Sequence, residues 1–334
     1  MSKLPSEWVE VLDLPLIAAP MFLVSSIELV GAACENRIIG AIPTPNARSP
    51  EILDDWLCRL TTRLDAARER GLQTAPWALG LTVHSTNPRL KEDLALCVKY
   101  RAPLVITALG SPRAAVVPVH DYGGLVFADV NTPEYAFKAV QTGVDGLVLV
   151  CSGSGGHTGQ IAAPAFVTAV REFWDGIIVI AGGMTRGESL RSAQLMGADL
   201  VYMGTRFIAS HESAADPRYK QMVVDCAFKD IICTNAITGA HANKLRPSLV
   251  KAGIDPDRLE AKAKGSFDLH YAEKQPKAWK DVWSAGHGVG DVKAVESVAA
   301  IVAELKKEYG ASIAREITDP WLAKYAPLSP GGGN

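Results

Sequence analysis

The chain lacks long apolar runs and carries almost no net charge, and these absences exclude several classes of protein. No apolar stretch reaches the roughly 18 to 20 residues that a membrane-spanning helix needs. The first eight residues are too polar for a secretory signal peptide. A formal net charge of −2 provides no electrostatic footprint for nucleic acid or for an anionic membrane. We therefore expect a cytoplasmic protein that binds neither nucleic acid nor a membrane.

The sequence also lacks paired cysteines, since no two of them form a Cys-x-x-Cys pair. The six cysteines are scattered along the chain. This spacing argues against a disulfide framework and against a structural zinc site, so no metal is expected. With 48% hydrophobic and 21% charged residues, the 334-residue chain has the composition of a globular protein with a sizeable core. This length suits either one large α/β domain or two ordinary domains.

Eight short apolar runs recur through the first two-thirds of the chain. They are continuous rather than alternating, as in strands that are buried on both faces of a parallel sheet. The runs are 16–19, 38–42, 77–83, 104–108, 125–128, 146–150, 177–181 and 200–203.

Helix signals lie between these runs. Ser49 before Pro50 predicts a helix start, and so do Asn87 before a helix over 89–98 and Asn131-Thr-Pro133 before one over 134–141. Gly143 and Gly197 are placed to end helices. Strand–helix alternation repeated eight times predicts a (β/α)8 TIM barrel. A doubly wound open sheet is the rival, although it seldom has eight consecutive units without an antiparallel strand.

The repeat stops after residue 210. Residues 216–284 read as mostly helical with no further strand, which predicts a helical cap, inserted near the C-terminus, over one end of the barrel. An amphipathic helix over 293–309 could close the outer ring. We therefore expect a barrel domain of residues 1–215 plus 285–326 and a cap or substrate domain of residues 216–284.

A glycine-rich segment with one histidine follows the sixth apolar run. The stretch Cys151-Ser-Gly-Ser-Gly-Gly-His-Thr-Gly159 lets the backbone approach a ligand and offers N–H groups. His157 has the side chain best suited to moving protons near neutral pH. The alternative is a flexible loop whose histidine makes only local hydrogen bonds.

Glycine pairs follow the seventh and eighth runs, where (β/α)8 barrels commonly bind phosphate. Gly182-Gly183 precedes a helix, and Gly204-Thr205 follows the next strand. Their N–H groups, the threonine hydroxyl and a helix N-terminus suit a dianionic phosphate without a lysine. Taken alone, either pair could simply make a tight turn.

Together these motifs resemble a known enzyme family. Ala19-Pro-Met21, Gly155-Gly-His-Thr-Gly159, Ala181-Gly-Gly183, Met203-Gly-Thr-Arg-Phe207 and Trp283-Ser-Ala-Gly286 are similar to motifs of nitronate monooxygenases, also called 2-nitropropane dioxygenases. That family includes flavin-dependent NAD(P)H:quinone reductases, and FabK-type enoyl reductases are related to it. The similarity runs from about Leu14 to Asp291.

The resemblance implies a barrel that holds one FMN. Ala19, Pro20 and Met21 would line the flavin ring, and Gly182, Gly183, Gly204 and Thr205 would bind its phosphate. Gly155 and Gly156 would approach the ring by their backbone, and His157 would be the catalytic histidine. Thr82 and Ala128 are aligned with flavin-contacting positions where the family often has Asn and Lys.

Two further histidines are candidates for substrate contact. His84 lies just beyond the third run, and His287 lies in a glycine-rich turn that the resemblance places near the flavin. The other four histidines, at positions 120, 211, 241 and 270, have no distinguishing context.

The resemblance implies oxidation of alkyl nitronates by O2 to carbonyl compounds and nitrite, with His157 as base or as substrate-binding group. The alternative is an NAD(P)H-dependent flavin reductase of quinones or enoyl thioesters. No G-x-G-x-x-G fingerprint occurs in a strand–helix setting, so a separate Rossmann domain is not expected. A non-catalytic barrel that binds a phosphate ligand is a third hypothesis. The sequence specifies neither the natural substrate, nor the reductant, nor the oligomeric state.

Overall fold

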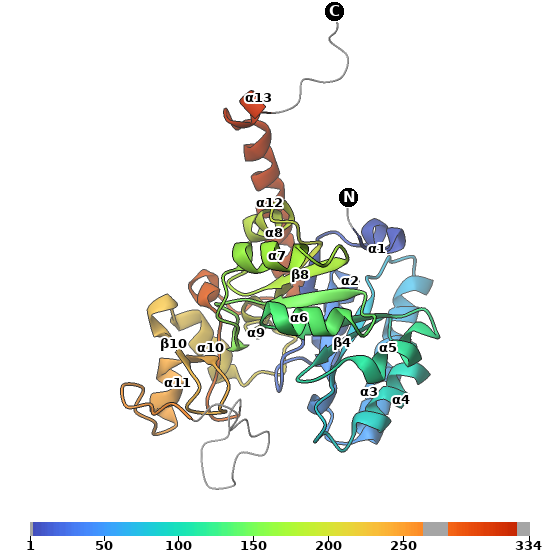
Figure 1. Ribbon diagram of the computed structural model, residues 1–334, viewed down its shortest axis with the longest axis horizontal. Helices are drawn as coiled ribbons and strands as arrows, with labels where there is room; N and C mark the ends of the chain where they lie inside the picture. Colours follow the sequence, from blue (N-terminus) through green and yellow to red (C-terminus); the bar gives the residue numbers. More distant parts are fainter. Residues whose placement is uncertain (1–2, 263–279, 326–334) are drawn as a thin grey trace, which may run out of the picture.

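The computed structural model describes residues 3–262 and 280–325, and its centre is a closed barrel of eight parallel strands (Figure 1). Each strand pairs with its neighbours, and β1 pairs with the last strand, β9, to close the ring. The strands are β1 (Leu16–Ala18), β2 (Ile39–Pro43), β3 (Trp77–Thr82), β4 (Leu104–Ala108), β5 (Leu125–Val130), β6 (Gly146–Val150), β8 (Ile177–Ala181) and β9 (Leu200–Met203). The predicted (β/α)8 barrel is confirmed, and each predicted apolar run supplies one of its strands.

Helices cover the outside of this barrel. The ring comprises α2 (Ile27–Glu35), α3 (Pro50–Glu69), α4 (Leu90–Lys99), α5 (Arg113–His120), α6 (Pro133–Val140), α7 (Ala163–Arg171), α8 (Gly187–Leu195) and α12 (Val298–Ile317), while α1 (Ser6–Val11) precedes β1. The predicted closing helix is α12, which begins five residues later than expected and packs against α8 and α2. Figure 1 shows the end of α12, followed by α13 (Leu322–Tyr325), projecting beyond the barrel.

Most of the predicted helix starts are confirmed by their capping bonds. The Ser49 side chain accepts a hydrogen bond from Ile52 N, and the Thr132 side chain accepts one from Tyr135 N. The prediction for Asn87 was wrong, because α4 begins at Leu90. The side chain of Asn87 instead accepts a hydrogen bond from Arg89 N, which forms a turn that precedes the helix.

The barrel has two apolar layers, one in its lumen and one between strands and helices. Phe127, Val148 and Ile106 belong to the lumen cluster, whereas Val126 and Leu147 belong to the outer cluster. Successive residues of a strand point to opposite faces, so the strand position decides which layer a side chain enters. At the end of β5, this alternation determines whether Ala128 or Asp129 faces the lumen.

A smaller unit follows β9 and lies beside the barrel in Figure 1. Its elements are α9 (Thr205–Ile208), α10 (Pro217–Asp225), β10 (Ile231–Thr234), β11 (Ala242–Leu245) and α11 (Arg246–Lys251), with 3-10 turns at Phe228–Asp230 and His287–Asp291. The strands form a three-stranded antiparallel sheet in the order β10-β11-β7, in which β7 is Gly156–His157 of the glycine-rich segment.

The expectation that residues 216–284 would be mostly helical without a strand was therefore wrong for their described part. The missed strand β11 reads Ala-Asn-Lys-Leu, which has no apolar run to mark it. Its Asn243 and Lys244 are nevertheless buried, because tertiary contacts rather than composition place them inside. Within the described parts of the chain, no helix combines the length and the hydrophobicity that crossing a membrane requires.

Candidate active site

The carboxyl ends of the barrel strands surround an open mouth. Residues there stay partly accessible although the strands beneath them are buried; they include Ala19, Pro20, Met21, Thr82, Asp129, Gly182, Gly183 and Gly204. Two of the predicted motifs meet directly, since a Cβ atom added to Gly204 would lie 3.4 Å from Met21 Sδ. The structure thus brings the ends of β1 and β9 together as expected.

The loop after β1 is held by two side chains that sequence reasoning missed. Met21 N donates a hydrogen bond to Ser25 Oγ at 2.9 Å. The Asn46 amide donates to the carbonyl oxygens of Met21 and Ser25, and its oxygen accepts from Leu23 N. A lone Asn after a strand is a weak signal, so only the contact identifies it as the residue that shapes this loop.

The two glycines after β8 differ in their surroundings. Gly182 has a φ of +122°, and a Cβ atom there would lie 2.8 Å from the carbonyl oxygen of Ser152. Gly183 has a φ of +68°, and no heavy atom lies within 4 Å of the place where its Cβ would be. Both positions disfavour side chains, but only Gly183 opens onto free space.

The glycine-rich segment packs against the Trp283-Ser-Ala-Gly286 motif. A Cβ atom on Gly155 would lie 2.8 Å from Gly286 N, so this glycine permits close packing of two backbones. Gly286 N in turn donates a hydrogen bond to Thr205 Oγ1 at 2.9 Å. Cys151, at the start of the segment, is buried, and burial raises the pKa of its thiol to about 12, which keeps the thiol un-ionised.

His157 lies on β7, directly opposite Ala242 of β11. Its Nε2 is 3.4 Å from Thr238 Oγ1. Burial, and secondly the positive charge of Lys244, lower the pKa of His157 to about 4. The residue keeps some accessible surface, and its imidazole is neutral near pH 7.

Lys244 was not predicted, although it lies on the same sheet face as His157. Ala242 opposes His157, and Lys244 follows Ala242 by two residues, which returns its side chain to that face. The side chain is fully buried, and burial lowers the pKa of its amine to about 7. The sheet β10-β11-β7 therefore places the basic side chains of His157 and Lys244 together.

The end of β5 requires a correction to the prediction for Ala128. Ala128 packs in the outer apolar layer and does not face the barrel mouth. The next residue, Asp129, shares the lumen face with Phe127 and has one carboxylate oxygen that is buried without a hydrogen-bond partner. Burial raises the pKa of Asp129 to about 7. A one-residue error in a strand moves a side chain to the other face, which explains the miss.

The two other candidate histidines have local contacts. His84 Nδ1 lies 2.7 Å from Thr86 Oγ1 in the turn after β3. His287 is exposed, and its ring meets Phe228 edge to face at 5.1 Å between ring centroids. His287 N donates to Gly153 O, so this turn supports the glycine-rich segment by its backbone. His270 lies outside the described residues.

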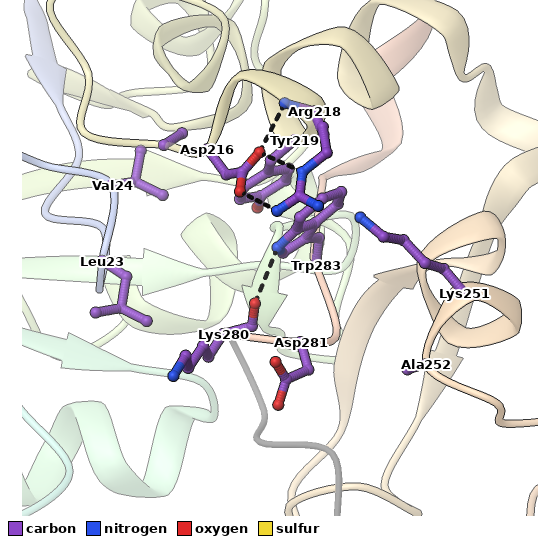
Figure 2. A pocket seen from close by; sticks show the side chains of 11 residues that line it. Leu23, Val24, Asp216, Arg218, Tyr219, Lys251, Ala252, Lys280, Asp281 and Trp283 are labelled. Atoms are coloured by element: carbon purple, nitrogen blue, oxygen red, sulfur yellow. Dashed lines mark hydrogen bonds and ion pairs between the residues drawn. The ribbon is translucent and has the colours of Figure 1, made fainter.

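A surface pocket of about 580 Å³ opens elsewhere, between the β1 loop and the smaller unit (Figure 2). The Arg218 guanidinium already binds Asp216 at 2.6 Å, and Lys251 lies over the Trp283 ring at 4.2 Å from its centroid. None of the predicted site residues lines this pocket. The barrel mouth, where the candidate residues gather, is therefore the better candidate for the active site.

Comparison with known proteins agrees with this geometry. The family model for nitronate monooxygenase matches residues 63–308. A nitronate monooxygenase from Paraburkholderia phytofirmans is 26% identical over 348 residues, covering 90% of this chain and 94% of that protein. A Mycobacterium tuberculosis relative, a 5-hydroxy-7a-methyl-1-oxo-octahydro-1H-indene-4-carboxyl-CoA dehydrogenase, is 22% identical over 240 residues, covering 71% of this chain and 64% of its own.

A solved structure supports the fold. Nitroalkane oxidase from Streptomyces ansochromogenes superposes with a TM-score of 0.78 at 23% identity, covering 93% of this chain and 100% of its own. The family model spans most of the chain and the barrel agrees with it, so the chain belongs to the nitronate monooxygenase family and is an oxidoreductase.

Proposed function

We propose that this chain is an FMN-dependent oxidoreductase that oxidises alkyl nitronates with O2 to carbonyl compounds and nitrite. The observation that carries the proposal is the neutral state of His157, which lies on β7 beside the barrel mouth. Burial and the positive charge of Lys244 lower the pKa of this histidine and so keep it un-ionised. Membership of the nitronate monooxygenase family supports the same substrate class.

The residues at the barrel mouth fit a flavin nucleotide. The open space at Gly183 is a cradle that any side chain would fill, and it lies next to a lumen that contains unpartnered polar atoms. Gly182, Gly183, Gly204 and Thr205 would hold the phosphate, and Ala19, Pro20 and Met21 would line the ring. The Thr205 hydroxyl accepts from Gly286 N, which leaves its own proton for a phosphate oxygen. Bound FMN would supply the electron acceptor that oxidation of a nitronate requires.

In this proposal His157 removes the α-proton when the substrate is a neutral nitroalkane. A neutral imidazole can accept that proton, whereas it offers no positive charge to a preformed nitronate. The protonated form of Lys244 stabilises the anion that the transfer creates. The neutral state of the imidazole therefore favours the base role of His157 over the role of an anion-binding group.

A second candidate is an NAD(P)H-dependent reductase of quinones or enoyl thioesters on the same barrel. The observation in its favour is the carboxyl-CoA dehydrogenase among the relatives, which acts on a thioester by its name. The two candidates differ in the electron donor. NAD(P)H is the donor in the second, while the nitronate itself is the donor and O2 the acceptor in the first.

The deciding experiment begins with the cofactor. Heat-released cofactor is compared with FMN and FAD standards by chromatography, and FMN is expected. The holoprotein is then mixed without oxygen with NADH, NADPH or a nitronate, and the flavin absorbance is followed. Rapid bleaching by the nitronate alone supports the first candidate, and rapid bleaching by NADH or NADPH supports the second. Recovery of FAD, or of no flavin, overturns both as stated.

The role of His157 has its own test, the His157→Ala variant. Turnover is expected to fall by roughly 10²- to 10⁴-fold for neutral nitroalkanes, with a smaller loss for preformed nitronates, while FMN stays bound. His211→Ala is the matched control, since that histidine is exposed and is not among the candidate site residues. Wild-type turnover of both substrate forms by His157→Ala would show that His157 is not the base.

A further inference from the structure

The lumen of the barrel contains a carboxyl and a phenol that are both buried without hydrogen-bond partners. Asp129 Oδ1 and Tyr202 OH carry these unsatisfied atoms. Tyr202 belongs to β9 and Asp129 to β5, two strands that β6 and β8 separate in the closed ring, and both residues lie at lumen-facing positions. Their proximity is reflected in the pKa of Tyr202, which burial and then the charge of Asp129 raise.

The surroundings of this pair are apolar. The lumen cluster contains Ile17, Ile39, Ala41, Ala78, Leu104, Ile106, Phe127, Val148, Ile177, Val179 and Leu200. Almost all buried polar groups of folded proteins have a hydrogen-bond partner, and an unsatisfied one costs free energy. Two unsatisfied groups in one apolar lumen therefore point to a partner from outside the protein.

That partner must enter through the mouth. Asp129 keeps part of its surface accessible, whereas Tyr202 is 6% exposed and lies deeper. An un-ionised carboxyl and a phenol are both O–H donors, so together they suit a flat ligand with hydrogen-bond acceptors at its edge. The ring carbonyls and ring nitrogens of a flavin have this chemistry.

We propose that Asp129 is a ligand-binding residue of the barrel mouth, whose un-ionised carboxyl donates a hydrogen bond to an acceptor on the flavin ring. This inference rests on the proposed function, because it takes the flavin as the ligand. Burial raises the pKa of Asp129 to about 7, so the donor form prevails in mildly acidic solution. Ionisation removes the donor and places a negative charge against the acceptors, so flavin affinity falls as the pH rises through about 7.

Lys244 of β11 also has a pKa that burial lowers to about 7, and the Asp129→Asn variant separates its titration from that of Asp129. The adjacent strands β4 and β6 contain no ionisable side chain. Across the lumen, the raised pKa of Tyr202 keeps its phenol neutral. The thiol of Cys151 and the imidazole of His157, which follow β6, are both neutral near pH 7.

The test uses the apoprotein with two probes, FMN and riboflavin, whose binding is followed by quenching of flavin fluorescence. Riboflavin lacks the phosphate, so it reports on ring contacts alone. Wild type, Asp129→Asn and Asp129→Leu are titrated at pH 6 and pH 8. Asp121→Asn, an exposed carboxyl that follows α5, is the matched control.

Three results are expected. Wild type and the control lose affinity for riboflavin several-fold from pH 6 to pH 8. Asp129→Asn, which keeps a donor and cannot ionise, binds equally at both pH values. Asp129→Leu binds both probes roughly three- to tenfold more weakly than wild type at pH 6, because it has no donor.

Equal affinities and equal pH dependence for wild type and both Asp129 variants would overturn the inference and leave ordered water as the partner. That outcome is distinct from failure of the proposed function, in which wild type itself binds neither probe. If Asp129→Leu does not fold, the comparison of wild type with Asp129→Asn decides alone.

Discussion

At the scale of single residues, the candidate site depends on basic and acidic groups whose protonation states differ from those in water. Burial makes the charged forms of His157, Lys244 and Asp129 unfavourable, so it lowers the pKa of the bases and raises that of the acid. Such groups cluster at functional sites because proton transfer near neutral pH needs matched pKa values.

Lys244→Met should raise the pKa of His157 from about 4 toward its ordinary value of 6.5. The variant removes the positive charge that opposes protonation of the imidazole, although burial remains the larger cause. The fall of kcat/KM at low pH then begins at a higher pH than in wild type. The measurement is the titration of the His157 ring by NMR, together with the pH profile of turnover. Lys251→Met, an exposed lysine over Trp283, is the control, and an unchanged His157 titration in Lys244→Met would refute the coupling.

Gly204→Asp should abolish FMN binding without unfolding the barrel. A Cβ atom at this position meets Met21 Sδ at 3.4 Å, an ordinary contact, so Gly204→Ala is the tolerated control. The added carboxylate would repel the phosphate in a partly desolvated site. Circular dichroism checks the fold and flavin absorbance checks the cofactor. Full retention of FMN by the aspartate variant would mean that the phosphate binds elsewhere.

At the scale of elements, the short sheet β10-β11-β7 connects the smaller unit to the glycine-rich segment. Besides its strand pairing, the Asn243 amide donates a hydrogen bond to Ser154 O at 2.7 Å. His157 is thus positioned by a strand, β11, that lies far along the chain at Ala242–Leu245. The position of the proposed base depends on this pairing.

Asn243→Ala should loosen the glycine-rich segment while the barrel stays intact. Loss of the buried bond leaves Ser154 O unsatisfied and costs about 1 to 3 kcal/mol of local stability. Faster hydrogen exchange at residues 152–159 is expected, with about tenfold lower kcat/KM and unchanged FMN content. Gln160→Ala, an exposed change on the same segment, serves as the control. Wild-type exchange in Asn243→Ala would argue that strand pairing alone holds His157.

At the scale of the whole molecule, helix α12 completes the ring of helices around the barrel. It packs against α8 and against α2, the first helix of the ring. Val298, Ile301, Val302 and Leu305 bury the inner face of this helix. Arg191 of α8 pairs with Glu316 of α12 at 2.7 Å, across the same interface. Helix α12 is therefore part of the barrel fold.

Ile301→Ala should destabilise the protein by about 2 to 4 kcal/mol, because it removes a fully packed side chain and leaves a cavity. The midpoint of denaturant unfolding is expected to fall, while FMN content under native conditions stays unchanged. Lys307→Ala, on the outer face of α12, should leave the free energy of unfolding within about 0.5 kcal/mol of wild type. A loss of FMN without a loss of stability would contradict this account.

Asp129 also makes global stability depend on pH. Its pKa is about 7 in the folded apoprotein and 3.8 as an ordinary value, so stability from this group is complete below 3.8 and is lost as the pH rises through about 7. Asp129→Asn should therefore be more stable than wild type by about 2 to 4 kcal/mol at pH 8, with the difference vanishing near pH 4. Urea unfolding of the apoproteins at both pH values measures it, and a difference that does not change with pH would refute the assignment.

The barrel, its strands and the family of this protein could all be predicted from the amino-acid sequence. Continuous apolar runs such as 146–150 and 177–181 are local signals, and so are the capping serine at position 49 and the glycines before helices. These signals act within a few residues of the chain, which is why they can be read without a structure.

Which side chains face the mouth depends on tertiary contacts that the sequence does not mark. At the end of β5 the residue that faces the lumen is Asp129 and not the predicted Ala128. Strand residues alternate between the two faces of a sheet, and the sequence does not mark which residue faces the lumen. The tertiary structure brings Lys244 beside His157 through a strand with no apolar pattern. Burial and strand pairing between distant segments determine these contacts and the pKa values of the side chains involved. Interactions between distant segments leave no local pattern in the sequence, so they cannot be predicted from it.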